Sequence, residues 1–299
     1  MKRAAFLAGS GAALFARRAV ARSLNVRIAR IARELPGRIG VYARTLAPDA
    51  PLAAYDAGEH FPTASVIKVL VMTTAYAKQQ AHPGALSAVV VYRSGDLIGG
   101  SDFMAGARDG QRFTVAELIV PMITVSDNTA ANLLIGHFGV QAINAVGKRA
   151  GMSRTHLARK FLDYSAIAHH NDNVSTPADM GHLLYLIELG AHEGIPTIVS
   201  PGHCRAMLDI MRGQTDRDGI PAALPAHTAV ANKTGEIEGT RNDVAVVSPY
   251  GDDPFVLAIM TKDAYDYAAA YAAIHAVTRD VYLCARGRYT SPASATRQP

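Results

Sequence analysis

The chain has 299 residues; 49% of them are hydrophobic, 18% are charged and none is Trp. At about 150 residues per domain, this length predicts one large domain or two closely associated ones, with a core that folds without disulfides or metal ions. The composition excludes an intrinsically disordered chain, a collagen-like repeat and a disulfide scaffold. Cys204 and Cys284 cannot by themselves hold a metal ion. An oxidising compartment would allow them to form a disulfide, but two buried thiols are the interpretation we favour.

The net charge of +5 does not indicate a nucleic-acid-binding protein. Residues 1–21 carry four of the 30 basic residues and none of the 25 acidic ones, so the rest of the chain has a net charge of only +1. Three of the remaining cations, Arg286, Arg288 and Arg297, lie near the C-terminus. The folded part is therefore near neutral and offers no basic stripe that could follow a phosphate backbone.

The first 21 residues have the pattern of a signal peptide. Lys2-Arg3 is followed by a 13-residue apolar run, Ala4 to Ala16, and Ala19-Val20-Ala21 has the small-x-small pattern of a cleavage site. The run is shorter than the about 20 residues that span a bilayer, and we find no other stretch that is long and apolar enough. We therefore predict a signal peptide over 1–21 and an exported, periplasmic or secreted protein. The alternative is an amphipathic start to the first helix.

Apolar periodicity predicts the elements in chain order. A helix over 23–35 ends at Pro36-Gly37, and strands over 38–46 and 51–55 form a hairpin. The middle of the chain has helical patterns over 65–80, 114–124, 128–137, 140–150, 177–189 and 201–212. Strand patterns return over 228–233, 243–248 and 255–261, a long helix closes the chain over 263–284, and 286–299 has the composition of a flexible tail.

Strands at both ends of the chain and helices between them predict an α/β fold of the α+β type. An antiparallel sheet built from both chain ends, flanked by the first and last helices, would carry an inserted all-helical domain. We place the sheet-containing domain at 22–60 and 213–285, and the helical domain at 61–212. Such folds bind ligands in the cleft between the two parts.

The first candidate for chemistry is Ser65-Val66-Ile67-Lys68. A spacing of three residues at the start of an apolar helix places the serine hydroxyl and the lysine amine on one face. A serine is a poor nucleophile unless a base takes its proton, and a lysine can be that base when burial and a nearby cation lower its pKa. The helix N-terminus also supplies a backbone N–H for a developing oxyanion.

Two further motifs make a chance occurrence improbable. A lone S-x-x-K arises by chance in about one such chain in three, but Ser126-Asp127-Asn128 at a helix start and Lys233-Thr234-Gly235 at a strand end accompany it here. Together the three motifs are expected by chance in about one chain in several thousand.

These motifs resemble those of the penicillin-recognising serine enzymes, and the chain is similar to class A β-lactamases. The similarity extends over about residues 23–285. It includes Phe61-Pro62-Thr63-Ala64 before the serine, Asn128 to Leu134 after the second motif, and Gly239-Thr240-Arg241-Asn242-Asp243 after the third. The family has the sheet and helical insert of the β-lactamase and transpeptidase fold, as expected above.

The resemblance implies a role for each motif residue. Ser65 corresponds to the nucleophile that becomes acylated and Lys68 to its base, acting directly or through water. Ser126 would pass a proton to the departing lactam nitrogen. Asn128 would bind the acylamide side chain of the substrate, and Asp127 would fix the turn.

The third motif and its neighbours correspond to the part of the site that binds the substrate carboxylate. Lys233 would supply positive potential and help to depress the pKa of Lys68. Thr234 and Arg241 would hydrogen-bond the carboxylate. Gly235 completes the motif that contains Lys233 and Thr234. The backbone N–H groups of Ser65 and Glu236 would form the oxyanion hole, with the Glu236 side chain in solvent.

The sequence departs from class A enzymes at deacylation. Those enzymes activate the hydrolytic water with a glutamate from the loop before a T-x-P-x-x-M stretch; the corresponding stretch is Ser175 to Met180 here. The loop from 159 to 173 is shorter than usual, and there is no glutamate between Glu117 and Glu188. Asp163 is the nearest substitute. His169-His170 could also act as a base, although an exposed loop tip is the simpler interpretation.

We therefore predict a serine hydrolase that opens β-lactams through an acyl-enzyme, with slow deacylation. A serine peptidase or esterase of the same superfamily and a penicillin-binding module that acylates without turnover are the alternatives. The partner is a small β-lactam or a related amide or ester; we expect a monomer, no cofactor, no metal, no nucleic acid and no stable membrane span.

Overall fold

The structure is a computed structural model that describes residues 19–47 and 51–287. Its centre is a five-stranded antiparallel sheet in the order β2-β1-β9-β8-β7. These strands are β1 (Arg38–Thr45), β2 (Ala53–Tyr55), β7 (Val230–Ile237), β8 (Thr240–Val247) and β9 (Phe255–Lys262). Strand β1 pairs with β9 from Arg38 opposite Lys262 to Thr45 opposite Phe255, which confirms a sheet built from both ends of the chain.

Helices and short strands fill the chain between β2 and β7. The helices are η1 (Ala64–Ile67), α2 (Lys68–Ala81), η2 (Ala85–Ser87), η3 (Ser94–Asp96), η4 (Phe103–Gly106), α3 (Val115–Thr124), α4 (Asn128–Phe138), α5 (Val140–Arg149), α6 (Tyr164–Ala168), α7 (Pro177–Glu193), α8 (Pro201–Arg212) and η5 (Ile220–Ala223). The short strands pair as β3 (Phe61–Pro62) with β6 (Val174–Ser175), and β4 (Val89–Val91) with β5 (Arg112–Thr114).

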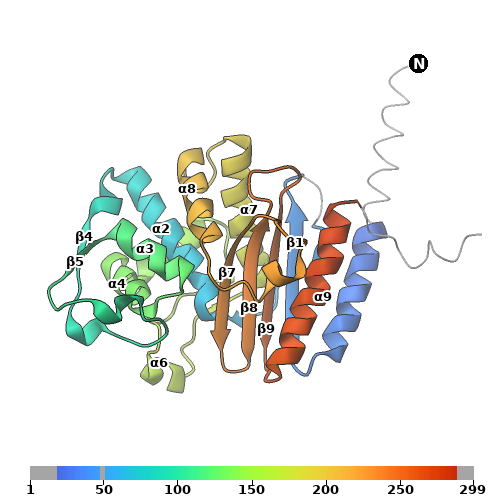
Figure 1. Cartoon of the computed structure of the whole chain (residues 1–299), viewed down its shortest axis with the longest axis horizontal. Coiled ribbons are helices and arrows are strands. Elements are labelled where there is room, and N and C mark those ends of the chain that lie inside the picture. The colour runs from blue at the N-terminus through green and yellow to red at the C-terminus, as the bar shows by residue number, and fades with distance from the viewer. Residues whose placement is uncertain (1–18, 48–50, 288–299) are drawn as a thin grey trace, which may run out of the picture.

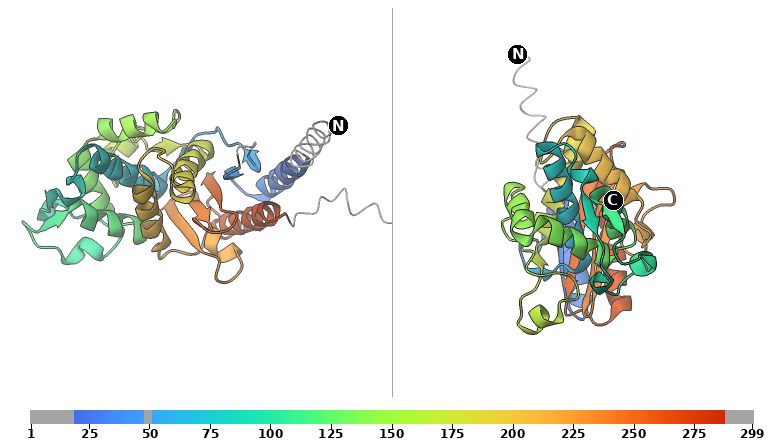
Figure 2. Two further views of the ribbon diagram at one scale, coloured as in Figure 1. Left: turned by 90° about the horizontal axis from the view of Figure 1, so that it is seen from above. Right: turned by 90° about the vertical axis from the view of Figure 1, so that its left-hand side faces the viewer.

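The sheet separates two apolar cores. Figure 1 shows the helix over residues 19–34 and helix α9 (Tyr267–Ala285) against one face, with α2, α7 and α8 on the other side. The short helix η5 lies with the terminal helices, because Ile220 belongs to their core. Alternating residues of β8 serve the two cores: Ala245 packs with the two terminal helices, whereas Val244 and Val246 pack with the inserted helices. This alternation is the two-residue period of a strand buried on both faces. The view from above in Figure 2 shows the resulting layers.

Helix α7 joins the inserted helices to the sheet. Thr176 caps its N-terminus by accepting a hydrogen bond from the N–H of Asp179, and Pro177 occupies the first turn, where no N–H is needed. Gly181 lets the helix approach β1 closely, because a Cβ there would lie 2.4 Å from the ring of Tyr42. We keep the division into a sheet-containing part and a helical part at 61–212 as a proposal.

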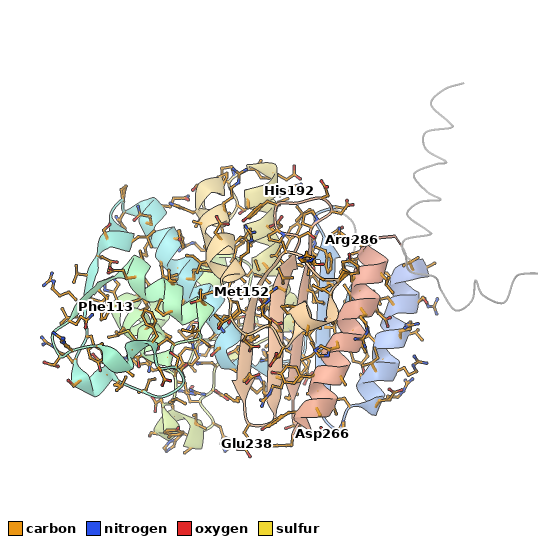
Figure 3. The ribbon with its side chains drawn as sticks, viewed as in Figure 1. Phe113, Met152, His192, Glu238, Asp266 and Arg286 are labelled. Carbon is orange, nitrogen blue, oxygen red and sulfur yellow. The ribbon has the colours of Figure 1, made fainter. Side chains whose placement is uncertain are left out.

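Several boundaries differ from those predicted. Lys233-Thr234-Gly235 lies inside β7, not at its end, because β7 and β8 form a hairpin that pairs as far as Ile237 opposite Thr240. Glu238-Gly239 makes the two-residue turn, with Gly239 at φ 69°, and Figure 3 shows Glu238 at this tip. The polar residues near the turn hide the strand pattern, so the sequence prediction ended the first strand too early and began the second too late.

Other differences have local causes. The predicted helix over 65–80 is the 3₁₀ turn η1 followed by α2, and the closing helix begins at Tyr267 because Asp266 caps it. The cysteines are free and buried, Cys204 in one core and Cys284 in the other, so the sheet separates them.

The predicted leader lies mostly outside the described residues, although its last three residues begin the helix over 19–34. The predicted tail is described only at residues 286 and 287. Within residues 19–47 and 51–287, no helix combines the length and apolar character needed to cross a bilayer.

Candidate active site

Ser65 lies in the 3₁₀ turn η1, in a short segment that is fixed from both sides. Ala64 just before it has φ 45°, a left-handed conformation that is unusual for an alanine. The N–H of Thr63 donates to the carbonyl of Asn173 in the loop before α7, at 2.9 Å. Asn242 of β8 donates to the carbonyls of Pro62 and Thr63 at 2.8 and 3.2 Å. The backbone of the nucleophile is therefore held by the sheet and the loop together.

Lys68 is fully buried one turn after Ser65 and faces the second motif. Its Nζ lies 2.7 Å from the Ser126 carbonyl, 2.7 Å from Asn128 Oδ1 and 3.2 Å from Ser126 Oγ. Burial, followed by the nearby positive charge of Lys233, holds the pKa of Lys68 well below its usual range, although Asp127 opposes the shift. All three are oxygen atoms placed to accept hydrogen bonds from Nζ.

The second motif forms a strained turn into α4. Ser126 has φ 58°, a left-handed conformation that costs a non-glycine residue about 1–3 kcal/mol. Buried Asp127 stabilises the turn, because its carboxylate caps α4 at the N–H of Ala130, 2.7 Å away, and accepts a hydrogen bond from the Ser101 hydroxyl. The structural role expected for Asp127 is therefore what the structure shows. The turn directs Ser126 toward Lys68.

Strand β7 passes close to the nucleophile. A Cβ on Gly235 would lie 2.8 Å from the Thr63 carbonyl oxygen and 3.0 Å from Ser65 N, so a side chain here would push the strand away from η1. Glycine therefore lets the Glu236 backbone follow the strand beside the backbone N–H of Ser65. An oxyanion hole formed by those two N–H groups needs the two backbones to approach each other in this way.

Lys233 is buried on the same side of β7 as Gly235. Its Nζ donates to the carbonyl of Thr234 at 2.8 Å. Burial lowers the pKa of Lys233 to about 8, with Asp243 the strongest of the opposing carboxylates. Lys233 therefore remains mostly charged at neutral pH, and this charge helps to lower the pKa of Lys68.

Arg241 and Glu236 lie opposite each other at the end of the hairpin. The Arg241 guanidinium stacks on Tyr267 at 3.6 Å and donates to two backbone carbonyls of the hairpin. Its Nε lies 3.6 Å from the Glu236 carboxylate, which also accepts a hydrogen bond from the Tyr271 hydroxyl. Arg241 is thus positioned by α9 before any substrate arrives. Glu236 is partly exposed as expected, but it lies in a strand and not in a turn.

The loop that should hold a deacylating carboxylate places an aromatic ring over Lys68 instead. The ring of Phe161 lies 4.3 Å from Lys68 Nζ. Asn132 holds this segment, because its side chain accepts from the Phe161 N–H at 2.7 Å and donates to the Phe161 carbonyl at 3.0 Å. Asn173 closes the loop by accepting from the N–H groups of Ala158 and Arg159. The loop is therefore well fixed, and its contact with Lys68 Nζ is an apolar aromatic ring.

Asp163 has another use in the structure. Its carboxylate caps the short helix α6 by accepting from the N–H of Ala166 at 3.0 Å, on an exposed part of the loop. His169 lies after α6, exposed, with Nδ1 2.8 Å from the Ser165 carbonyl. The structure therefore brings together Ser65, Lys68, Ser126, Asn128 and Lys233, and it gives Asp163 no contact with them among the described residues.

A model of the β-lactamase enzyme family matches residues 23–283. The chain belongs to this family. It is 33% identical over 239 residues to the carbapenem-hydrolysing β-lactamase KPC of Klebsiella oxytoca, covering 78% of this chain and 79% of the relative.

Solved structures give the same result. The β-lactamase of Desulfarculus baarsii superposes with a TM-score of 0.78 at 30% identity, over 88% of this chain and 96% of that one. A leucine-to-glutamate mutant of PBP-A in an acyl-enzyme complex with penicillin G superposes with a TM-score of 0.78 at 25% identity, over 88% and 96%. The fold is therefore that of class A β-lactamases, as the motifs predicted.

Some residues that build this β-lactamase-type site were not found from the sequence. Asn132, Asn173 and Asn242 fix backbone segments around Ser65, and Phe161 covers Lys68. Asn132 lies one helical turn after Asn128, on the same face, which is a signal that spacing could have given. Within residues 19–47 and 51–287, no group of three His, Cys, Asp or Glu side chains could hold a metal ion.

Proposed function

We propose that this member of the β-lactamase enzyme family opens β-lactam rings by forming an acyl-enzyme on Ser65. The observation that carries the proposal is the buried Lys68 amine, three residues from Ser65, held against Ser126 and Asn128 with a lowered pKa. A lowered pKa increases the unprotonated fraction of this amine, which is the form that can act as a general base. The Ser65 hydroxyl has no hydrogen-bond partner among the described residues, so it is available to a substrate.

In the acylation step, Ser65 Oγ forms a bond to the lactam carbonyl carbon and the ring C–N bond breaks. The proton of Ser65 passes to Lys68 Nζ, directly or through water. Ser126 Oγ delivers its proton to the departing nitrogen and takes one from Lys68 Nζ in return. The 3.2 Å contact between Lys68 Nζ and Ser126 Oγ supports this route. The backbone N–H groups of Ser65 and Glu236 stabilise the oxyanion of the tetrahedral intermediate.

Charged groups on the other side of the cleft bind the substrate carboxylate. Lys233 supplies positive potential, and Thr234 and Arg241 donate hydrogen bonds. The Glu236 carboxylate lies 3.6 Å from Arg241 Nε, so a substrate carboxylate competes with it for the guanidinium. Asn128 binds the acylamide group through its side chain, which already contacts Lys68 and the Gly99 carbonyl.

Deacylation is slow in this proposal. Hydrolysis of the ester needs a base that takes a proton from the attacking water, and such assistance is typically worth about 10²–10⁴-fold. Phe161 provides no base, and Asp163 is occupied as a helix cap. The relation to PBP-A, whose mutant is known as an acyl-enzyme with penicillin G, also favours a long-lived intermediate.

Intact-mass spectrometry after mixing with benzylpenicillin tests the proposal. We expect rapid addition of one intact penicillin mass, followed by slow return to the unmodified mass. No adduct together with no hydrolysed product would reject the proposal, whereas hydrolysis of a peptide or ester without a β-lactam adduct would favour the peptidase or esterase alternative. An adduct that never decays would identify a penicillin-binding module.

We further propose that residues 1–21 direct export and that the mature protein acts as a monomer outside the cytoplasm. The basic start, the apolar run and the small residues 19–21 support export. N-terminal sequencing of protein from its host should find a start near Arg22. Intact Met1 in a soluble cytosolic fraction would contradict export, and size-exclusion chromatography tests the monomer.

A further inference from the structure

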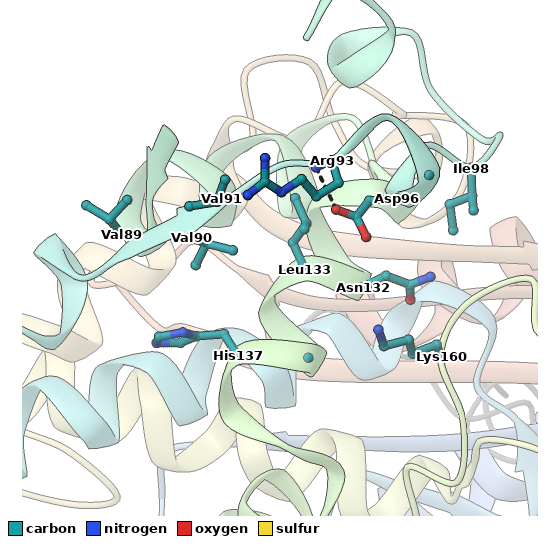
Figure 4. Close-up of a pocket in the computed structure, with 12 residues that line it drawn as sticks. Val89, Val90, Val91, Arg93, Asp96, Ile98, Asn132, Leu133, His137 and Lys160 are labelled. Carbon is teal, nitrogen blue, oxygen red and sulfur yellow. Dashed lines mark hydrogen bonds between the residues drawn. The ribbon is translucent and has the colours of Figure 1, made fainter. Parts of the chain in front are cut away.

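A cavity of about 610 Å³ lies beside the candidate active site and contains none of its catalytic residues. Figure 4 shows the edge of β4 on one side and Asn132, Lys160 and Ile98 on the other. Its apolar lining comes mainly from Val89, Val90, Val91, Ile98 and Leu133.

Helix α4 leads from the candidate active site to the cavity. Asn128, Asn132 and Gly136 are spaced four residues apart, so they lie along one side of the helix at steps of about 6 Å. Asn128 faces Lys68 in the site, whereas Asn132 and Gly136 line the cavity. The loop at 98–99 spans the same two places: the Gly99 carbonyl accepts from Asn128, and Ile98 lines the cavity.

The charges in the cavity favour an anionic ligand. Its charged lining residues are Arg93, Lys160 and Asp96. Asp96 accepts a hydrogen bond from the backbone N–H of Arg93 at 2.8 Å, and the Arg93 guanidinium pairs with Asp109 at 3.7 Å. Lys160 Nζ has no acidic partner among the described residues.

Lys160 is aimed into the cavity by its surroundings. Its ammonium lies beside Gly136 of α4, where a Cβ would be 3.4 Å from Lys160 Nζ, an ordinary van der Waals contact. The neighbouring residue Phe161 is fixed through its backbone by Asn132. Figure 4 shows the Lys160 ammonium directed toward α4.

We propose that this cavity is the distal end of the substrate cleft and that Lys160 binds a terminal carboxylate on an extended N-acyl substituent of the substrate. The inference rests on the proposed function, since Asn128 must hold the acylamide group at the near end. The apolar valines accommodate the methylene chain, and Lys160 pairs with the carboxylate about one to two helical turns beyond Asn128.

Matched penicillins test this proposal. The probe is 6-(adipoylamino)penicillanic acid, compared with its side-chain monomethyl ester, which has the same length and no terminal charge. The wild-type protein should be acylated about three- to fivefold faster by the acid than by the ester at low salt, the range expected for an exposed ion pair. The succinyl pair, two methylenes shorter, should show a smaller preference because its carboxylate does not reach Lys160.

The matched variants are Lys160→Glu and Lys148→Glu. Both exchange an exposed lysine for the opposite charge, but Lys148 lies on α5 outside the cavity. Lys160→Glu should reverse the acid-to-ester preference, and Lys148→Glu should keep it. Added salt at about 0.5 M should weaken the wild-type preference, because mobile ions screen exposed charges.

Benzylpenicillin separates the two possible failures. If it does not acylate the wild-type protein, the proposed function is rejected and the inference with it. If benzylpenicillin acylates normally but the acid-to-ester ratio is the same in the wild type and Lys160→Glu, the inference alone is overturned. An equal preference at both side-chain lengths would also overturn it.

Discussion

The two sides of Lys68 present opposite chemistry to the same amine. On the side of the second motif, Ser126 and Asn128 place three oxygen atoms within 3.2 Å of Nζ. On the side of the loop, the Phe161 ring covers it at 4.3 Å. Helix caps and asparagine side chains fix the backbone on both sides. The two sides therefore differ in the groups that they present to Lys68 and not in how well they are ordered. In the proposed mechanism, the polar side of Lys68 serves acylation, and the side where deacylation needs a base is apolar.

The largest expected effect comes from removing the nucleophile. Ser65→Ala should abolish covalent labelling by benzylpenicillin, because no other hydroxyl occupies this place. The Ser65 side chain caps no helix and has no hydrogen-bond partner among the described residues, so the free energy of unfolding should change by less than about 0.5 kcal/mol. Intact-mass spectrometry and urea unfolding measure the two quantities. Ser165→Ala, in the exposed loop, is the control, and labelling of Ser65→Ala at the wild-type rate would reject the nucleophile.

A base can be introduced on the loop side of Lys68. Phe161→Glu should shorten the lifetime of the acyl-enzyme by about 10²–10⁴-fold, because a carboxylate would replace the ring beside Lys68 and could activate water. Stopped-flow nitrocefin hydrolysis should lose its initial burst. Phe161→Leu is the control, since it opens similar space without a base. Equal lifetimes in both variants would show that the missing carboxylate is not what limits deacylation.

The pH dependence of acylation should report the two lysines. Below the pKa of Lys68 the amine is protonated and cannot accept a proton, so the rate should fall about tenfold per pH unit on the acid side. Above the pKa of Lys233, about 8, the second lysine loses its charge; substrate binding weakens, and the pKa of Lys68 rises. The profile of acylation efficiency should therefore be bell-shaped. Stopped-flow acylation between pH 5 and 10 tests it, and a flat basic side would contradict the role of Lys233.

The sequence was sufficient for most of the fold because the apolar periodicity is strong. Helices α3, α4, α5 and α8 begin and end within one residue of their predicted bounds. It failed where polar residues pair in a strand, at the tip of the β7–β8 hairpin, and where very short strands form through long-range contacts, as in β3 with β6. Local patterns carry no information about such distant partners.

In the candidate site, too, some residues could be predicted from the sequence and others could not. Ser65, Lys68, Ser126 and Lys233 were predicted because motif spacing encodes them directly. The deacylating side was not, since a missing glutamate suggests a substitute carboxylate, and Asp163 was the nearest in the chain. In the structure Asp163 caps α6, a five-residue helix that no sequence pattern predicted. Phe161 was overlooked because an apolar residue in a loop carries no catalytic signal.

The smallest expected effect is that of replacing Asp163. Asparagine caps helices about as well as aspartate, so Asp163→Asn should preserve α6 and leave the acyl-enzyme lifetime within about twofold. A general base would behave differently: losing its carboxylate should lengthen that lifetime by about 10²-fold or more. Asp163→Ala serves as the matched variant, because it removes both the charge and the cap and should cost about 1 kcal/mol of local stability. The decay of the penicillin adduct, followed by intact mass in all three proteins, distinguishes the roles. A long-lived adduct in Asp163→Asn would mean that the loop moves Asp163 over the ester once acylation has occurred.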